Sequence, residues 1–475
     1  MKKFLFTIFT LLIIQNTSIA LDIVYPTKEY SKINSSSSFF VGSVNKGDKL
    51  YLNNKEITVH RTGAFAQPVN LSVGKNEFRI ETNNCVKNYV IERPVYSKTA
   101  PVKLQEYNGI KTVEVTRNGA PIRTTSIQSG INRISHFPKG MKLQAVAEFG
   151  DMYKIELSPI EKAWIAKSDV KVKTNYIEKT FLYDYRKRET KDKFIYEFAL
   201  SKRTPYSITE GKEMILKIYN VSANDNDTAI FKFKLNQRLM GYDLKYKGDT
   251  LVLSIKKEPK LDKKLPLKNV KIVVDAGHGG RELGAIGCCR NYEKDFNLSI
   301  ARYLEFYLKE MGANVYMTRN SDRFVSLNDR VKYTNDKDAQ IFISIHANSL
   351  PDSSNPQKHR GSSVYYYYDE ARPLSEAIIN ALSKEMNINI EGINQASFAV
   401  VRNTSAVSIL VETAYVINPD DNELLMTDNF RKKYAKVLAD GIKNYVWQTK
   451  SDKLSWLKNN KIKFSKVSWL YKLGQ

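Results

Sequence analysis

Four side chains that could build a catalytic centre stand at the ends of predicted strands and at the start of a predicted helix. The chain has only 5 His, and two of them, His278 and His346, directly follow apolar runs that predict buried strands. Glu293 opens an amphipathic helix, and Glu412 closes a further apolar run. Sites in open α/β sheets gather at the carboxyl ends of strands, so we expect these side chains to lie close together.

Two imidazoles and carboxylates at one edge of a sheet indicate a catalytic zinc centre. Zn²⁺ commonly takes two His and one Glu and leaves one position for water. The ion lowers the pKa of that water and polarises a carbonyl group. A further carboxylate is then needed as a base that stands near the metal without binding it. Gly277, Gly279 and Gly280 around the first His allow close approach of the backbone.

Each of these signals has a simpler explanation when it is taken alone. A His at a strand end is commonly a surface or packing residue, and Gly-His-Gly-Gly at 277–280 also fits a plain turn. Glu293 could serve only as a favourable charge at a helix start. Glu412 is harder to explain in this way, because a carboxylate that closes an apolar strand is costly without a partner or a cleft.

The segment at 268–447 alternates predicted strands with predicted helices. Helix periodicity is clearest after Glu293, and Ser326 is a plausible N-cap for the next helix. This alternation predicts an α/β domain whose mixed sheet is flanked by helices. The predicted strands are 271–274, 314–318, 340–345, 398–401 and 408–412, and the predicted helices are 295–311, a helix from 326, 371–386 and 430–447.

The stretch from Lys271 to Tyr445 resembles the zinc-dependent N-acetylmuramoyl-L-alanine amidases, the amidase type 3 family. The motifs occur in family order over this whole stretch, which makes the resemblance very specific. They are Val274–Gly280, Gly284–Gly287, Glu293–Asp295, Thr318–Arg319, Leu327 with Arg330, Ser344–Asn348, Gly361–Tyr366, Phe398–Arg402 and Val411–Pro419.

This resemblance implies a cofactor, a reaction and a role for each candidate residue. In the family, the equivalents of His278, Glu293 and His346 bind Zn²⁺, and the equivalent of Glu412 is the catalytic glutamate. The implied reaction hydrolyses the amide between the lactyl group of N-acetylmuramic acid and L-alanine of the peptidoglycan stem peptide. Glu412 would accept a proton from the attacking water and return it to the departing nitrogen. The motifs identify no substrate-binding residue.

The sequence departs from the family pattern in two places. Cys288 and Cys289 replace a Gly-containing loop before Glu293, where thiolates could compete for metal or respond to oxidation. Small buried or free thiols are the alternative, since three Cys make no disulfide framework. Some relatives carry a plugging helix after the second His, and 349–360 is too short for one. We therefore expect an open cleft, with control through localisation by the preceding modules.

Short β-rich runs separated by turn residues fill the chain before the α/β segment. They predict all-β modules: one similar to immunoglobulin-like domains, one similar to bacterial SH3 barrels, and one placed like the envelope-targeting AMIN-like β-sandwich of periplasmic amidases. The basic tail could contact the wall or pack as a helix. The predicted organisation is a signal peptide at 1–20, modules at 22–97, 100–174 and 176–258, a linker at 259–267, the amidase domain at 268–447 and a tail at 448–475.

The first 20 residues have the order of charges and apolar residues that is typical of a secretory signal. We expect export to the periplasm or the cell wall, without a stable membrane anchor. The net charge of +24 suits an envelope that contains anionic wall polymers, although solubility alone would also explain it. An exported protein does not meet chromosomal DNA, so we expect peptidoglycan and no nucleic acid as the partner.

Two other functions compete with the amidase. One is a non-catalytic wall-binding protein, which the complete four-residue set disfavours. The other is a zinc hydrolase that cuts another amide or a free muropeptide, which the wall-like modules and export disfavour.

Overall fold

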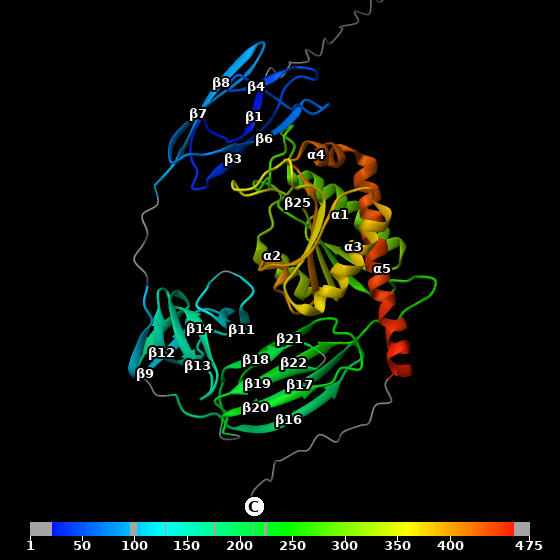
Figure 1. The fold of residues 1–475 in the computed structure, drawn as a ribbon. Helices are drawn as coiled ribbons and strands as arrows, with labels where there is room; N and C mark the ends of the chain where they lie inside the picture. Colours follow the sequence, from blue (N-terminus) through cyan, green and yellow to red (C-terminus); the bar gives the residue numbers. More distant parts are fainter. Residues whose placement is uncertain are drawn as a thin grey trace, which may run out of the picture.

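The structure is a computed structural model that describes residues 21–95, 102–128, 130–174, 177–211, 213–222 and 226–459. Three β-rich parts precede an α/β domain (Figure 1). The signal peptide predicted at 1–20 and the tail beyond 459 lie outside the described residues. Within the described part of the chain, no helix combines the length and apolar character that a membrane crossing requires.

The first β-rich part contains two sheets that share one core. A three-stranded sheet has the order β1-β3-β6, and a five-stranded sheet has the order β2-β8-β7-β4-β5. Phe40, Leu50 and Ile91 lie in the core between them. The strands are β1 (Asp22–Tyr25), β2 (Tyr30–Lys32), β3 (Ser37–Ser43), β4 (Leu50–Leu52), β5 (Lys55–Ile57), β6 (Ala64–Asn70), β7 (Gly74–Thr82) and β8 (Cys85–Arg93).

The second β-rich part is one seven-stranded sheet of order β11-β10-β14-β13-β12-β9-β15. Alternate residues of β12, such as Leu143 and Ala145, point into its core, as expected for a strand with one buried face. Its strands are β9 (Gln105–Val115), β10 (Ala120–Arg123), β11 (Arg133–Phe137), β12 (Lys142–Phe149), β13 (Met152–Glu156), β14 (Lys162–Ala166) and β15 (Val170–Lys173), with a 3-10 turn η1 (Lys167–Asp169).

The third β-rich part pairs a four-stranded sheet, β16-β17-β22-β21, with a three-stranded sheet, β18-β19-β20. Its core is continuous with that of the second part, so the two pack together. The strands are β16 (Leu182–Glu189), β17 (Lys193–Leu200), β18 (Tyr206–Thr209), β19 (Met214–Tyr219), β20 (Thr228–Phe233), β21 (Tyr242–Lys247) and β22 (Thr250–Lys256).

The α/β domain is built on a mixed six-stranded sheet of order β24-β23-β25-β28-β26-β27, which confirms the predicted fold class for this segment. Strands β24, β23, β25 and β28 are parallel, and β26 runs antiparallel to β28. The strands are β23 (Lys271–Ala276), β24 (Asn314–Met317), β25 (Ile341–Asn348), β26 (Ser362–Tyr366), β27 (Ile390–Gln395) and β28 (Val407–Tyr415). The helices are α1 (Glu293–Glu310), α2 (Leu327–Asp336), α3 (Arg372–Glu385), α4 (Pro419–Met426) and α5 (Asp428–Asn459), with 3-10 turns η2 (Asp369–Ala371) and η3 (Ala399–Val401).

Helices cover both faces of this sheet. Residues of α1, α3 and α5 join one face in a large core, whereas η3 and a side chain of α2 pack on the other face. Strand β23 serves both cores, because Ile272 and Val274 point to the first and Val273 to the second. This arrangement leaves the strand ends free to carry polar side chains.

Two predicted elements of this domain differ from the structure. The apolar run at 398–401 is the 3-10 turn η3 rather than a strand, and Val400 and Val401 pack against the sheet instead of joining it. A short apolar run has no periodicity that separates these two outcomes. The last helix, predicted to end at 447, continues to Asn459, so the predicted tail begins as helix. The predicted linker ends in a packed turn, where Leu267 is fully buried.

The β-rich parts contact the α/β domain on two sides (Figure 1). Asp22 of the first part forms an ion pair with Arg290 in the loop before α1. At the third part, the buried amine of Lys256 donates hydrogen bonds to the backbone carbonyls of Ala339 and Ser405. These contacts hold the α/β domain between its β-rich neighbours.

Candidate metal centre

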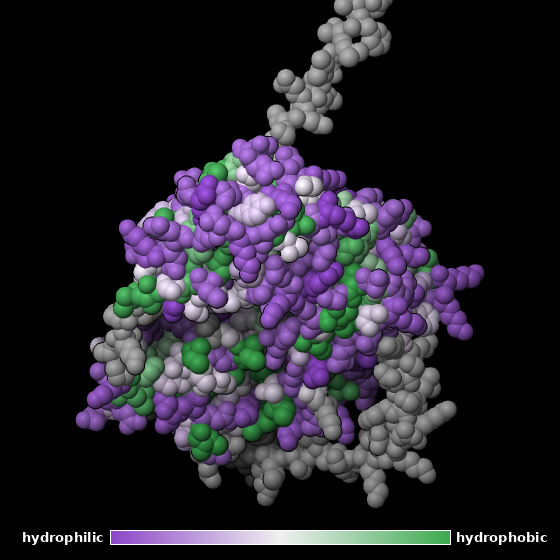
Figure 2. Space-filling view, turned by 45° about the horizontal axis from the view of Figure 1, so that its top comes forward, coloured by the Kyte–Doolittle hydropathy of each residue, from purple (hydrophilic) through white to green (hydrophobic). Residues whose placement is uncertain are grey.

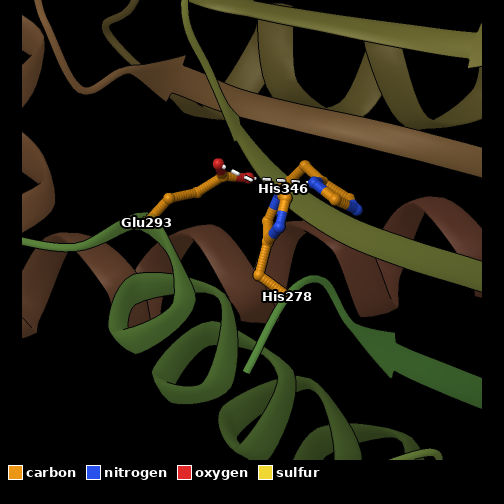
Figure 3. Close-up of side chains that lie close together, drawn as sticks. All are labelled: His278, Glu293 and His346. Atoms are coloured by element: carbon orange, nitrogen blue, oxygen red, sulfur yellow. Dashed lines mark hydrogen bonds and ion pairs between the residues drawn. The ribbon is translucent and has the colours of Figure 1, made fainter. Parts of the chain in front are cut away.

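His278, Glu293 and His346 converge from three separate elements (Figure 3). One potential ligand atom from each lies within 4.8 Å of the others. His278 follows β23, Glu293 is the first residue of α1, and His346 lies on β25. The two imidazole rings are 5.0 Å apart between centroids and nearly perpendicular. The structure therefore brings together three of the four residues that the sequence singled out.

Glu293 links the two histidines through its carboxylate. Its Oε2 lies 3.2 Å from Nε2 of His278, and its Oε1 lies 2.9 Å from Nδ1 of His346. Backbone N–H groups of Ala285 and Ala347 donate to the same carboxylate at 2.8 and 3.2 Å. Burial alone would raise the pKa of Glu293, but the hydrogen bonds and charges of the two histidines hold it well below its usual range. The carboxylate is thus fixed in its ionised form.

Two glycines make room for this cluster. A Cβ atom on Gly277 would lie 2.3 Å from Nε2 of His346, which is closer than real contacts allow. Gly284 has a φ of +71°, and a Cβ there would lie 2.4 Å from Oε2 of Glu293. Close backbone approach near the first histidine was predicted from the Gly-rich motif, and Gly277 meets that expectation.

A buried ion pair fixes the loop that carries His278. The carboxylate of Asp275, on β23, accepts hydrogen bonds from Thr318 at 2.5 Å, from Ser344 at 2.7 Å and from Arg330 at 2.5 Å. Arg330 also donates to the backbone carbonyl of His278 at 2.9 Å. Since both charges of this pair are buried, each depends on the other for compensation.

A second buried arginine supports the same loop. The guanidinium of Arg319 donates to the carbonyls of Ala276 and Gly277 at 2.9 Å and to that of Lys294 at 2.7 Å. Arg319 and Arg330 belong to the family motifs, but the motifs assign no function to either of them. In the sequence they are simply charged residues within these motifs. The fold shows that they position the loop of the first histidine.

Glu412 lies on β28, directly opposite His346 on the neighbouring strand β25. Its Oε2 is buried and has no hydrogen-bond partner among the described residues. Burial raises the pKa of Glu412 to about 7, with the His346 charge opposing the shift and the Glu293 charge adding to it. Glu412 therefore stands beside the three converging residues without joining them, as a carboxyl group that exchanges a proton near neutral pH.

A cavity of about 470 Å³ opens at the two histidines. Its walls include Phe324 from the loop before α2, Leu327 from the start of α2, and Ala399 and Val400 from η3. Its volume falls in the range of ligand-binding clefts.

The surface in the second view is mostly polar, with small scattered apolar groups (Figure 2).

The donor set fits a divalent metal ion. Two imidazole nitrogens and one ionised carboxylate form a common catalytic metal site. The Glu293 charge adds to the raised pKa of Glu412, and a cation held by the three residues would offset that repulsion. Thr413 also donates to the backbone carbonyl of His346 at 3.0 Å, which fixes the strand segment that carries this histidine.

Comparison with known proteins identifies the segment that carries these residues. Residues 272–444 match the family described as N-acetylmuramoyl-L-alanine amidase. A protein of Staphylococcus epidermidis named Probable cell wall amidase LytH is 36% identical over 182 residues, which cover 38% of this chain and 60% of that protein. This chain thus spans 60% of the length of the curated relative.

Solved structures match the same segment. The N-acetylmuramoyl-L-alanine amidase AmiC2 of Nostoc punctiforme is 35% identical, with 38% of this chain and 99% of that chain covered and a TM-score of 0.36. The catalytic domain of the amidase CwlV of Bacillus (Paenibacillus) polymyxa var. colistinus is 32% identical, with 38% and 99% covered and a TM-score of 0.36. The α/β domain of this chain therefore matches the N-acetylmuramoyl-L-alanine amidase family.

Proposed function

We propose that this chain is a zinc-dependent N-acetylmuramoyl-L-alanine amidase that hydrolyses the amide between the lactyl group of N-acetylmuramic acid and L-alanine of peptidoglycan stem peptides. One observation carries the proposal. Inside the matched family segment, His278, Glu293 and His346 form a potential metal site, and Glu412 stands on the adjacent strand with an unpartnered oxygen. We assign the first three as ligands and Glu412 as the catalytic carboxylate.

Each side chain has a task that follows from its surroundings. Zn²⁺ held by the three ligands would activate water and polarise the scissile carbonyl. Glu412 has a pKa of about 7 and can accept a proton from the attacking water, then donate it to the departing alanine nitrogen. Arg330 and Arg319 keep the loop of His278 in position. The cavity beside the histidines would admit the stem peptide next to the bond that is cut.

The β-rich parts are proposed to deliver the enzyme to the wall. We assign an immunoglobulin-like module to 22–97, an SH3-like module to 100–174 and an AMIN-like module to 176–258. A net charge of +24 supports contact with anionic wall polymers after export to the periplasm or cell wall. The loop at 349–360 contains no helix, which supports an open cleft.

Digestion of purified peptidoglycan sacculi tests the proposed reaction. The full chain with Zn²⁺ should release stem peptides with a free N-terminal alanine, identified by mass. Glu412→Gln should slow release by roughly 10²- to 10⁴-fold, the usual contribution of a general acid–base group. Glu385→Gln, at an exposed position of α3, is the matched control and should retain the wild-type rate.

Three results would contradict the proposal. Products cut within the glycan would assign a different bond. Cleavage of soluble muropeptides without cleavage of sacculi would favour a different substrate. Full activity of Glu412→Gln would remove the carboxylate from the mechanism.

A further inference from the structure

A group of arginines lies where the second β-rich part meets the α/β domain, away from the metal centre. Arg123 ends β10, Arg133 begins β11, and Arg402 directly follows η3. The domains touch here, because the backbone N–H of Arg133 donates to the hydroxyl of Tyr367 at 3.0 Å. We call Arg123, Arg133 and Arg402 the junction arginines.

The junction arginines lack the partners that buried cations normally have. Arg123 is only 5% exposed, yet its Nε and Nη1 have no hydrogen-bond partner among the described residues. Nε of Arg133 is likewise buried without a partner. Among the described residues, the guanidinium of Arg402 donates to Ser397 alone, through the carbonyl and hydroxyl oxygens of that serine. Orphaned guanidinium groups in a native interface call for an explanation, since leaving them unsatisfied costs folding free energy.

Nearby charges do not compensate them. Asp169 is the carboxylate whose charge reaches Arg123 and Arg133, but both its oxygens already bind Arg117 at 2.6 and 3.1 Å. His136 lies 3.4 Å from Nη1 of Arg133, and burial together with the surrounding arginines lowers the pKa of His136 to about 4. The histidine therefore stays neutral and adds no further positive charge. The group retains an excess of positive charge.

An anion would satisfy both deficits, and the proposed function suggests a carboxylate, because stem peptides carry free carboxylates. Ala399 and Val400 line the cavity beside His278 and His346, and Arg402 comes two residues later in the chain. Arg133 and Arg402 are only partly buried, so solvent reaches the group. A guanidinium fork matches a carboxylate through two parallel hydrogen bonds.

We propose that the junction arginines bind a free carboxylate of the stem peptide while its muramoyl end occupies the metal centre. This inference rests on the proposed function and adds a substrate feature that the enzyme reads. The site combines side chains of two domains, so the second β-rich part contributes to substrate selection as well as to localisation.

Binding to the full-length chain tests this site. Glu412→Gln serves as the background so that the peptide is not consumed, and the probes are a soluble muropeptide with free stem carboxylates and the same muropeptide with those groups converted to amides. The carboxylate form should bind at least roughly ten-fold more tightly than the amide form. Adding Arg123→Gln and Arg133→Gln should remove this preference, and Lys139→Gln, an exposed position of the same domain, should preserve it.

A second readout covers failure to fold. Arg123→Gln removes an unpaired buried cation, so its melting temperature without peptide should equal or exceed that of wild type. If Arg123 had a purely structural role, the variant would melt at a lower temperature. If the double variant melts early, Arg402→Gln, from the other domain, should still reduce the carboxylate preference.

Several outcomes would overturn the site. The first is equal binding of the two muropeptides. The second is an unchanged carboxylate preference in both the double variant and Arg402→Gln. The third is displacement of the peptide by inorganic phosphate at a lower concentration than by acetate. If wild type cleaves sacculi but shows no carboxylate preference, only this inference fails. If wild type releases no stem peptides, the proposed function itself fails.

Discussion

Two glutamates whose carboxyl groups have buried oxygens, at the interface of the third β-rich part and the α/β domain, predict how stability depends on pH. Glu210 lies between β18 and β19, and its Oε2 accepts a hydrogen bond from the backbone N–H of Glu370 in η2 at 3.4 Å. Oε1 of Glu210 and Oε2 of Glu370 are buried without partners among the described residues. Burial raises the pKa of Glu210 to about 7, and burial together with the Glu210 charge raises that of Glu370 well above its usual range.

The size and sign of the effect follow from linkage. A rise in the pKa of Glu210 from 4.5 to about 7 corresponds to about 3 kcal/mol. Because both folded-state pKa values are raised, the folded state binds more protons than the unfolded state between these values. The stabilisation is therefore complete below pH 4.5 and is lost as the pH rises through about 7.

Glu210→Gln removes the carboxyl group whose pKa is raised to about 7 and, with it, the charge that adds to the raised pKa of Glu370. We expect the melting temperature of the variant relative to wild type to increase between pH 5 and pH 8, by roughly 6–12 °C for a cooperative unit of 150–250 residues. Scanning calorimetry of the full chain at several pH values measures this difference. Glu385→Gln, an exposed carboxylate of the adjoining α/β domain, controls for loss of one negative charge and should give a small, pH-independent shift. A constant difference between Glu210→Gln and wild type would refute the reasoning.

Three further predictions concern the metal centre. Gly284→Ala places a Cβ 2.4 Å from Oε2 of Glu293 and should lower the rate of sacculus digestion at least ten-fold. Gly392→Ala is the control, because it is also at positive φ but has open space around it, and it should keep the wild-type rate. Equal losses in the two variants would show that backbone strain alone is responsible. Asp275→Asn leaves Arg330 buried without its countercharge and should lower the free energy of unfolding in urea by roughly 3–5 kcal/mol, and a loss under about 1 kcal/mol would contradict the role of the pair. Chelation should lower the melting temperature, and added Zn²⁺ should restore it. The loss in free energy of unfolding should reach about 3 kcal/mol if free Zn²⁺ was at 100 times its Kd before chelation. An unchanged transition would contradict metal binding.

The α/β domain was predictable because its signals are local. Alternation of apolar runs with amphipathic stretches indicated its strands and helices, and the Ser326 cap was identified from residue type and position alone. The hydroxyl of Ser326 does accept a hydrogen bond from the backbone N–H of Asp329. The proximity of His278, Glu293 and His346 followed from the rule that strand ends of an α/β sheet meet at one edge.

Features that depend on tertiary contacts were not predictable in this way. Strand β27 and helix α4 were missed, because β27 has mixed polarity and α4 is short. The compensation of Asp275 by Arg330 requires two elements to meet, and no spacing in the sequence reveals it. The meeting of Arg133 with Tyr367 depends on how two domains dock, which leaves no local pattern at all.

Among the described residues, Glu412, the pair formed by Glu210 and Glu370, and Arg123 all have buried polar atoms without hydrogen-bond partners, and their chemistry separates them. Glu412 and the pair formed by Glu210 and Glu370 can become neutral by binding a proton, so a closed environment is tolerable for them at lower pH. A guanidinium group has no such escape, because it keeps its proton at any physiological pH. Arg123 keeps its charge, and an anion from outside the described chain would balance it, which is the physical reason for expecting a ligand there rather than another proton-binding site.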